Sequence, residues 1–300
     1  MESRPRRSRS LLALRQSGTL SDEEVHWLRS SKAFFLADPC WISEAERLIA
    51  AECFHYRRRI GQIILVRESG SRAVSIRTIR ASEFHHSFPM VYTFNDACLI
   101  IPESAAANQV CAISINSNGK VISEIAILTG CQLVDPIVFC HDGSYWMFAN
   151  PLHNFDNELV VFRGDSAVGP WHATALWFLP IPNCRGAGRI FEQDGVLYWP
   201  TQFNTRRYGG GVILRRIVSL TATQLNHEIV SVIRPDPKGS RPLGFHTVNK
   251  GEHQYLVDGL AYRFSPLKPL YVLAARMRRK LRRSERRKKE ASTHVGPHEK

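Results

Sequence analysis

The hydrophobic and polar positions of this chain form a pattern that returns five times. Each copy is an apolar run, a polar or glycine turn, a second apolar run and then a polar residue. The copies begin at Asp38, Phe88, Asp135, Arg189 and His246, at intervals of 50, 47, 54 and 57 residues. Turn residues such as Asp-Gly between two apolar runs favour a β-hairpin. Self-similarity at this period is typical of a propeller or solenoid array.

Further short β-like runs lie between the hairpins, at residues 62–66, 110–115, 159–162 and 211–217. A hairpin with one or two additional strands makes a blade of three or four strands. The pattern therefore predicts an all-β, five-bladed β-propeller over residues 31–265. A propeller turns equivalent positions of its blades toward one axis, so polar residues far apart in the sequence are expected to share a pocket.

The two ends of the chain differ from this core in charge. Residues 1–30 are predicted to be a basic tail followed by a short helix capped by Ser21. Residues 266–300 are predicted to be a basic amphipathic helix, with apolar residues at helical spacing, that runs into a disordered tail. The formal net charge is +13, and residues 1–15 and 266–300 carry all of it, because residues 16–265 sum to zero.

Dense basic tails mark interaction segments. Amphipathic spacing at 266–290 favours an anionic membrane surface. Nucleic acid is the weaker alternative, since no aromatic residue follows Tyr271 in this tail to stack on bases. A charge run without any partner is a third interpretation. The chain has neither an apolar run of transmembrane length nor the apolar region of a signal peptide. The expected location is therefore cytoplasmic, with peripheral attachment to the inner membrane as an option.

The sequence offers little support for a metal, a cofactor or a disulfide framework. It has seven cysteines, none spaced as CxxC, and several lie in apolar runs, where a free cysteine acts as a small hydrophobe. Neither HExxH nor HxH occurs, and the glycines at 186 and 188 do not follow the dinucleotide fingerprint. We therefore expect no metal and no cofactor.

Several short motifs, taken in order, resemble a known family. They include FLADP, HSFP, IPES, DPIVF with HDG and YWMFA, GPW, AGRIF, LYWP, RRYG and FHT followed by VDG, between residues 33 and 264. Together they resemble the N-terminal domain of glucosamine inositolphosphorylceramide transferases. That domain is similar in fold to the five-bladed propellers of glycoside hydrolase families 43 and 32. The resemblance implies a propeller in a carbohydrate context, but not the transferase reaction, which is attributed to a separate domain of the plant proteins.

The resemblance implies carboxylates on the innermost strands, and Asp38 and Asp135 stand at the first polar position of two copies. Proline after each is expected to hold the aspartate in an extended conformation. The fourth copy has Arg189 there, which cannot donate a proton at neutral pH and places simple hydrolysis in doubt. His246 begins the fifth copy and is a candidate acid or base.

The second polar position of the copies carries Glu52, Glu103, Asn150, Gln202 and Asp258. Asp38 with Glu52, or Asp135 with Glu103, could form the carboxyl pair that glycoside chemistry needs, with one group kept protonated. Capping of strands and turns is the alternative role for each residue alone. As an enzyme, the chain would use Asp38 as base or nucleophile, Asp135 to orient it, and Glu103 or Glu52 as acid.

The segment 183–211 is rich in arginine and glycine. Its candidate ligand-binding residues, together with polar residues of the hairpins, are Arg185, Arg189, Gln202, Arg206, Arg207, Tyr208 and Asp258. Planar guanidinium groups suit phosphate or carboxylate, and a tyrosine ring can stack on a sugar. Pairing of these arginines with nearby Asp and Glu is the equally weighted alternative.

Together these features predict a propeller that binds or processes a glycan, a sugar phosphate or a glycolipid precursor in cell-surface polysaccharide or glycolipid metabolism. Its activity would be glycoside hydrolase-like or associated with glycosyl transfer. A non-catalytic module that partners a separate glycosyltransferase is the main alternative. Nucleic-acid binding through the tails is the third.

Overall fold

The computed structural model describes residues 18–22, 25–30, 35–55, 58–80, 82–94, 97–204 and 208–261. These residues are almost wholly β-strand, and their single helical turn is Ala105–Ala107. Four sheets of four or five strands and one sheet of two strands account for the strands. The predicted all-β, propeller-like fold is thereby confirmed. Residues 1–17 and the predicted helix within 266–300 lie outside the described residues.

The first blade shows why these segments become strands. Leu48–Ala51 and Ile63–Val66 are unbroken buried apolar runs, and such runs read as strands covered on both faces. Its strands follow the sequence from the innermost outward: β3 (Leu36–Ser43), β4 (Leu48–His55), β5 (Ile60–Ser69) and β6 (Arg72–Arg80).

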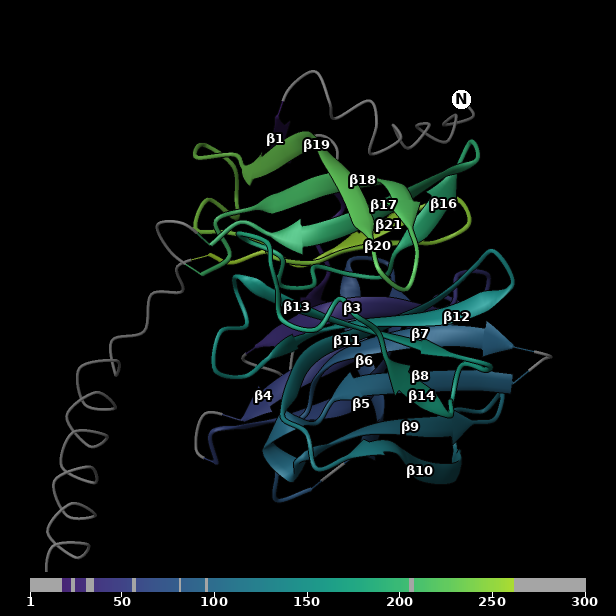
Figure 1. Cartoon of the computed structure of the whole chain (residues 1–300). Coiled ribbons are helices and arrows are strands. Elements are labelled where there is room, and N and C mark those ends of the chain that lie inside the picture. Colours follow the sequence, from purple (N-terminus) through teal and green to yellow (C-terminus); the bar gives the residue numbers. More distant parts are fainter. Residues whose placement is uncertain are drawn as a thin grey trace, which may run out of the picture. The chain divides into compact units, whose positions relative to one another are not determined.

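The second and third blades repeat this order, and Figure 1 shows β7 to β10 side by side in one sheet. The second blade consists of β7 (Ser87–Phe94), β8 (Ala97–Glu103), β9 (Gln109–Ile115) and β10 (Val121–Thr129). The third consists of β11 (Leu133–His141), β12 (Ser144–Pro151), β13 (Glu158–Gly164) and β14 (Trp171–Ala173), with β15 (Leu179–Pro180) also paired to β13.

The fourth blade includes a strand from the part of the chain that precedes the first blade. Its strands are β16 (Phe191–Gln193), β17 (Val196–Gln202), β18 (Val212–Leu220) and β19 (Leu225–Pro235), and β1 (Thr19–Leu20) pairs in parallel with β19. Similarly, β2 (Arg29–Ser30) pairs in parallel with β6. The described residues of 18–30 thus join sheets by backbone pairing, and the short helix predicted after Ser21 is not found among them.

The prediction of five complete blades is wrong for the described residues. After the fourth blade the chain forms only a two-stranded sheet, β20 (Val248–Lys250) with β21 (Tyr255–Val257). Both strands contact β3 of the first blade. The Val248 N–H donates to Ala187 O, just before β16, at 2.7 Å. Among the described residues, a hairpin and not a complete blade therefore lies between the fourth and first blades.

A β-bulge interrupts the innermost strand of three blades at the same point. The pairing skips between Ala37 and Cys40, and equivalent skips occur in β7 and β11. The residues at these bulges, Asp38, Phe88 and Asp135, have φ values of 51°, 48° and 49°. The expectation that proline keeps these aspartates extended is therefore wrong. Positive φ is rare and costly for side chains other than glycine, and such residues cluster at functional sites.

Apolar packing within and between blades forms the core beside these strands. The ring of Phe148 on β12 meets Phe139 on β11 at 5.1 Å and Trp199 of the fourth blade at 5.3 Å, both edge to face. Aromatic pairs in this arrangement contribute about 0.5–1.5 kcal/mol beyond the area they bury. Cys40, Cys111 and Cys184 are buried in the same core, as expected of small apolar side chains.

No helix of the described residues is both long and apolar enough to cross a membrane.

Candidate functional site

The innermost strands surround a cavity of about 360 Å³, here called the central cavity. Carboxyl side chains reach it from three blades: Asp38 from β3, Glu52 from β4, Glu103 from β8 and Asp135 from β11. The remaining lining residues are Phe35, Phe54, His85, Ser87, Val134, Leu152, Phe155, Arg185, Gln202 and Tyr208. The structure thus brings together all four carboxyl groups that the sequence singled out for catalysis.

The strand register explains this convergence. Ala37, which precedes Asp38, pairs with Glu52, and Ser87, which precedes Phe88, pairs with Glu103. Val134, which precedes Asp135, pairs with Asn150 in the same way. The second polar position of each hairpin therefore lies beside the bulge of the same blade. This is the arrangement that the repeat predicted.

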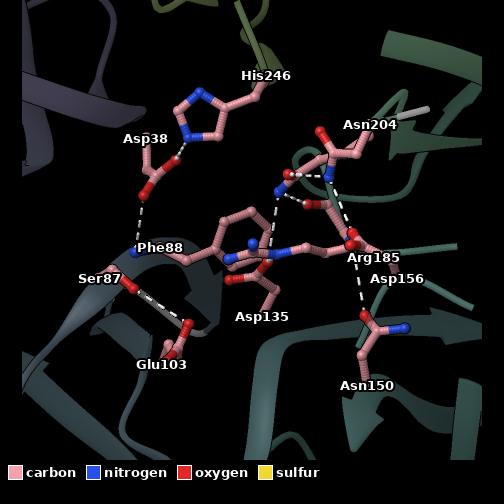
Figure 2. A network of polar contacts seen from close by, with 12 residues as sticks. Asp38, Ser87, Phe88, Glu103, Asp135, Asn150, Asp156, Arg185, Asn204 and His246 are labelled. Atoms are coloured by element: carbon pink, nitrogen blue, oxygen red, sulfur yellow. Dashed lines mark hydrogen bonds and ion pairs between the residues drawn. The ribbon is translucent and has the colours of Figure 1, made fainter. Parts of the chain in front are cut away.

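Asp38 belongs to a buried charged triad with His246 and Asp258, and Figure 2 shows the contact between Asp38 and His246. The Nε2 atom of His246 lies 3.1 Å from Asp38 Oδ1, and its Nδ1 atom lies 2.7 Å from Asp258 Oδ2. Burial alone would lower the pKa of His246, but the two carboxylates raise it well above its ordinary value. Burial acts to raise the pKa of Asp258, and the His246 charge outweighs it, so that this pKa is lowered. The imidazolium therefore forms an ion pair with a carboxylate at each nitrogen.

Backbone groups complete the triad. Asp38 Oδ2 accepts from the Phe88 N–H at 3.1 Å, so the bulge of the next blade fixes the carboxylate. Asp258 Oδ1 accepts from the His246 and Thr247 N–H groups at 2.8 and 3.2 Å. Three side chains that offer metal ligands stand close together here. Since each His246 nitrogen already meets a carboxylate, the arrangement is satisfied as an ion-pair chain and does not point to a cation site.

Glu52 differs from the other carboxyl groups of the cavity in its lack of a partner among the described residues. It is only 6% exposed, yet no described group donates a hydrogen bond to its carboxyl or forms an ion pair with it. Burial, and next the nearby Asp38 carboxylate, raise the pKa of Glu52 to about 9. Gly61 on the neighbouring strand leaves the space, since a Cβ there would collide with Glu52 Oε1. Glu52 is therefore a neutral carboxylic acid at neutral pH, facing the cavity.

Glu103 and Asp135 form a second carboxyl pair. Burial, and next the Asp135 carboxylate, raise the pKa of Glu103 to about 8, and the protonated acid hydrogen-bonds to Asp135. The Ser87 hydroxyl donates to Glu103 Oε2 at 3.1 Å. Arg185 donates from Nε to Asp135 Oδ2 at 2.6 Å. Burial raises the pKa of Asp135, and the Arg185 charge opposes that rise.

Six of the seven predicted ligand-binding residues fall into three groups. Arg185, Gln202 and Tyr208 line the cavity, with the Arg185 guanidinium 4.8 Å from the Phe155 ring and 5.5 Å from the Tyr208 ring. Gln202 Nε2 donates to Gly186 O at 2.8 Å and to Asp135 Oδ2 at 3.4 Å. Asp258 does not line the cavity and forms an ion pair with His246 in the charged triad. Arg206 and Arg207 lie outside the described residues.

Arg189 is placed elsewhere than the sequence led us to expect. Its guanidinium donates to Val91 O at 2.7 Å and to Lys250 O at 3.0 Å, so it ties β7 to β20 and does not line the cavity. The Gln202 N–H donates to Arg185 O at 2.8 Å, so Arg185 is the residue that pairs with Gln202. Gly186 follows Arg185 just as Asp38 and Asp135 follow the residues paired with Glu52 and Asn150 in their blades. The fourth blade thus presents glycine, not arginine, at the equivalent position.

The aromatic wall of the cavity escaped prediction from sequence. Phe35, Phe54 and Phe155 lie before, at the end of and after strands, where no repeat position marks them. His85 also lines the cavity and was not among the residues singled out from the sequence. Its Nδ1 accepts from the Gly61 N–H at 2.8 Å, and burial lowers its pKa, so it is a neutral ring. The histidine of the HSFP motif is His86, so that motif marked the neighbouring residue and not His85.

Comparison with known proteins agrees with this fold and places the chain in a family. The family described as glucosamine inositolphosphorylceramide transferase 1, N-terminal, matches residues 32–244. The chain belongs to this family. It is 25% identical over 187 residues to glucosamine inositolphosphorylceramide transferase 1 of Oryza sativa subsp. japonica, a match that covers 60% of this chain and 23% of that protein. The Arabidopsis thaliana protein of the same name is 26% identical over 198 residues, covering 59% and 25%.

The chain thus spans about a quarter of the curated relatives it matches. Among solved structures, it is similar to a GH43_1 enzyme from Xanthomonas citri complexed with xylose. The TM-score is 0.51 at 11% sequence identity, over 82% of this chain and 86% of that one. At this identity the likeness concerns the fold alone, and it agrees with the propeller-like arrangement of the blades.

Proposed function

We propose that the central cavity binds a glycan, free or as part of a sugar phosphate or glycolipid, and acts on a glycosidic bond. The observation that carries this proposal is the contrast between two carboxyl groups of one cavity. Asp38 forms an ion pair with His246, whereas Glu52 is a buried acid with a raised pKa and has no hydrogen-bond or ion-pair partner among the described residues. Carboxyl groups held in opposite protonation states are what glycoside chemistry requires.

The proposed step uses both groups. Glu52 gives its proton to the leaving oxygen while the bond between that oxygen and the anomeric carbon breaks. Asp38 takes a proton from an attacking water, whose oxygen bonds to the anomeric carbon, and solvent then returns that proton to Glu52. A sugar hydroxyl in place of water would give glycosyl transfer by the same proton movements. Asp135 and Glu103, hydrogen-bonded to each other, would orient the sugar together with Arg185.

Replacement of Asp38 by asparagine tests this proposal. Asparagine keeps the shape and tolerates the positive φ, but it cannot take up the proton, so turnover of a cleavable glycan should fall about a hundredfold while glycan affinity is kept. Asp194→Asn is the matched control, because Asp194 also has a positive φ (54°) but lies in an exposed turn. Unchanged turnover by the folded Asp38→Asn protein would contradict the assigned role.

A second candidate function is glycan binding without turnover, as an accessory module of a separate glycosyltransferase. It is favoured by the ion pair of Arg185 with Asp135 and by the glycine at position 186, where a further acid would complete a hydrolase-like site. In that case the wild-type protein binds a glycan and converts none of a panel of gluco-, galacto- and manno-oligosaccharides and their nucleotide-activated sugars.

The place of action belongs to the same proposal. Residues 266–300 carry twelve Lys or Arg against three Glu, a composition that favours the anionic surface of the inner membrane on its cytoplasmic side. Deletion of these residues should abolish sedimentation with vesicles that contain phosphatidylglycerol while the propeller stays folded. Equal sedimentation of the shortened chain would refute this attachment.

A further inference from the structure

A row of aromatic side chains lies on the third blade, outside the central cavity. Trp177 and Phe178 precede β15 and are 42% and 43% exposed. The Trp177 ring stands edge to face on buried Phe162 at 5.2 Å and on Phe178 at 5.3 Å, and Phe178 meets the His153 ring at 5.5 Å. These contacts hold two large rings in fixed positions while a good part of each faces solvent.

The backbone holds Phe178 in this place at a cost. Its φ is 56°, in the left-handed region that an aromatic residue rarely adopts. The next residue, Leu179, pairs with Leu159 on β13, and Leu176 is buried, so the chain is fixed on both sides of the ring. Strain that surrounding structure maintains is frequently found at ligand-contacting positions.

The row begins at the rim of the central cavity. The loop between β12 and β13 carries Leu152 and Phe155, which line the cavity, and His153, which packs against Phe178. Leu152 is itself 42% exposed. An exposed apolar surface that continues the lining of a ligand cavity is a natural extension of that site.

Polar groups beside the rings indicate what the row would bind. Glu158 accepts hydrogen bonds from His153 Nε2 at 3.1 Å and from Asn154 Nδ2 at 2.8 Å. A flat aromatic face with hydrogen-bonding groups at its edge suits a sugar ring, which has apolar C–H faces and polar hydroxyl edges. The carboxylate opposes an anionic lipid headgroup, and acyl chains would leave these polar groups unsatisfied.

We propose that Leu152, His153, Trp177 and Phe178 form an outer subsite that stacks a sugar ring of a glycan whose end occupies the central cavity. The ligand is therefore an extended oligosaccharide or the glycan chain of a glycoconjugate. This inference rests on the proposed function, because the cavity must hold the first sugar.

Calorimetric titration with gluco-, galacto- and manno-oligosaccharides, from monosaccharide to hexasaccharide, tests the outer subsite. Wild-type affinity should rise with chain length. Phe178→Gly should lose about tenfold in affinity for the long chains and nothing for the monosaccharide. Glycine favours the φ of this position, so the variant removes the ring without straining the backbone. Trp177→Ala should act alike, and Ile122→Ala, an exposed apolar residue of β10, is the control.

The outcomes separate the two proposals. If the wild type binds saccharides but Phe178→Gly and Trp177→Ala bind every length as well as it does, the outer subsite is refuted and the proposed function stands. If the wild type binds no saccharide of any length, the proposed function fails and the subsite with it. If the two variants instead lose binding to phosphatidylcholine vesicles with no effect of glycan length, the row is a lipid-contacting surface and the inference is wrong.

Discussion

Glu52→Gln is expected to lower turnover by about 10²- to 10⁴-fold, the usual contribution of a positioned general acid, while glycan binding is retained. Glutamine fills the same space beside Gly61 but has no proton to give to a leaving oxygen. The effect should be largest for substrates with poor leaving groups, and an activated aryl glycoside, which needs little protonation, should recover much of the lost rate. Steady-state rates with both substrate types measure this difference.

Glu46→Gln is the matched control for this experiment. Glu46 lies in the exposed turn of the same β3–β4 hairpin, so the chemical change is identical but remote from the cavity. Its rates should equal those of the wild type. If Glu52→Gln slows natural and activated substrates by the same factor, Glu52 acts in binding or positioning, and the assignment of the acid must pass to Glu103.

The sequence predicted the centre of this site because its information is carried by a repeat. Once Asp38, Phe88 and Asp135 are taken as equivalent, the partners Glu52, Glu103 and Asn150 follow from the length of the hairpin alone. Because the strands of each hairpin pair in the same register, residues at equal spacing in the sequence occupy equivalent places in their blades. The two carboxyl pairs could therefore be expected from the sequence. Their protonation states could not, because these depend on burial and on distances between blades.

The fourth repeat shows where such prediction stops. Arg189 begins an apolar run as Asp38 and Asp135 do, but β16 has only three residues and starts at Phe191. The chain from Arg185 to Arg189 approaches the neighbouring hairpin so closely that Gly188, with φ of 138°, has no space for a Cβ beside Val248 O. Spacing in sequence does not reveal such a local rearrangement, and the register therefore shifted by three residues.

The prediction of a complete fifth blade failed for a related reason. The run from His246 to Asp258 has the polarity of a complete repeat, and hairpin formation followed as expected. A blade needs further strands beside the hairpin, and among the described strands β20 and β21 pair only with each other. The loop residues Phe155, Trp177 and Phe178 were missed because aromatic residues in loops carry no periodic signal. Only the folded chain shows that they gather at one rim.

The carboxyl groups of the cavity also predict an unusual dependence of stability on pH. The pKa of Glu52 rises from 4.5 to about 9 on folding, and that of Glu103 from 4.5 to about 8. Between these limits the unfolded chain has released protons that the folded chain retains. The free energy of unfolding should therefore decrease as pH rises, by about 1.4 kcal/mol per pH unit for each group.

The charged triad also affects the dependence of stability on pH. His246 makes the loss of stability at rising pH steeper, and Asp258 causes a loss of stability at low pH. The raised pKa of His246 gives stability that is complete below its ordinary value of 6.5 and is lost as pH rises through the folded value. The lowered pKa of Asp258 gives stability that is complete above 3.8 and is lost as pH falls through the folded value. The protein should thus be most stable in mildly acidic solution.

Urea unfolding of the wild type and Glu52→Gln at a series of pH values tests this expectation. The wild-type free energy of unfolding should fall by several kcal/mol between mildly acidic and alkaline buffer. The Glu52→Gln curve should be flatter by about 1.4 kcal/mol per pH unit, since glutamine does not titrate, whereas Glu46→Gln should keep the wild-type slope. A Glu52→Gln curve parallel to that of the wild type would mean that Glu52 is ionised in the folded protein. The neutral acid on which the proposed chemistry depends would then be absent, so one set of unfolding curves bears on both the stability and the catalytic role of this residue.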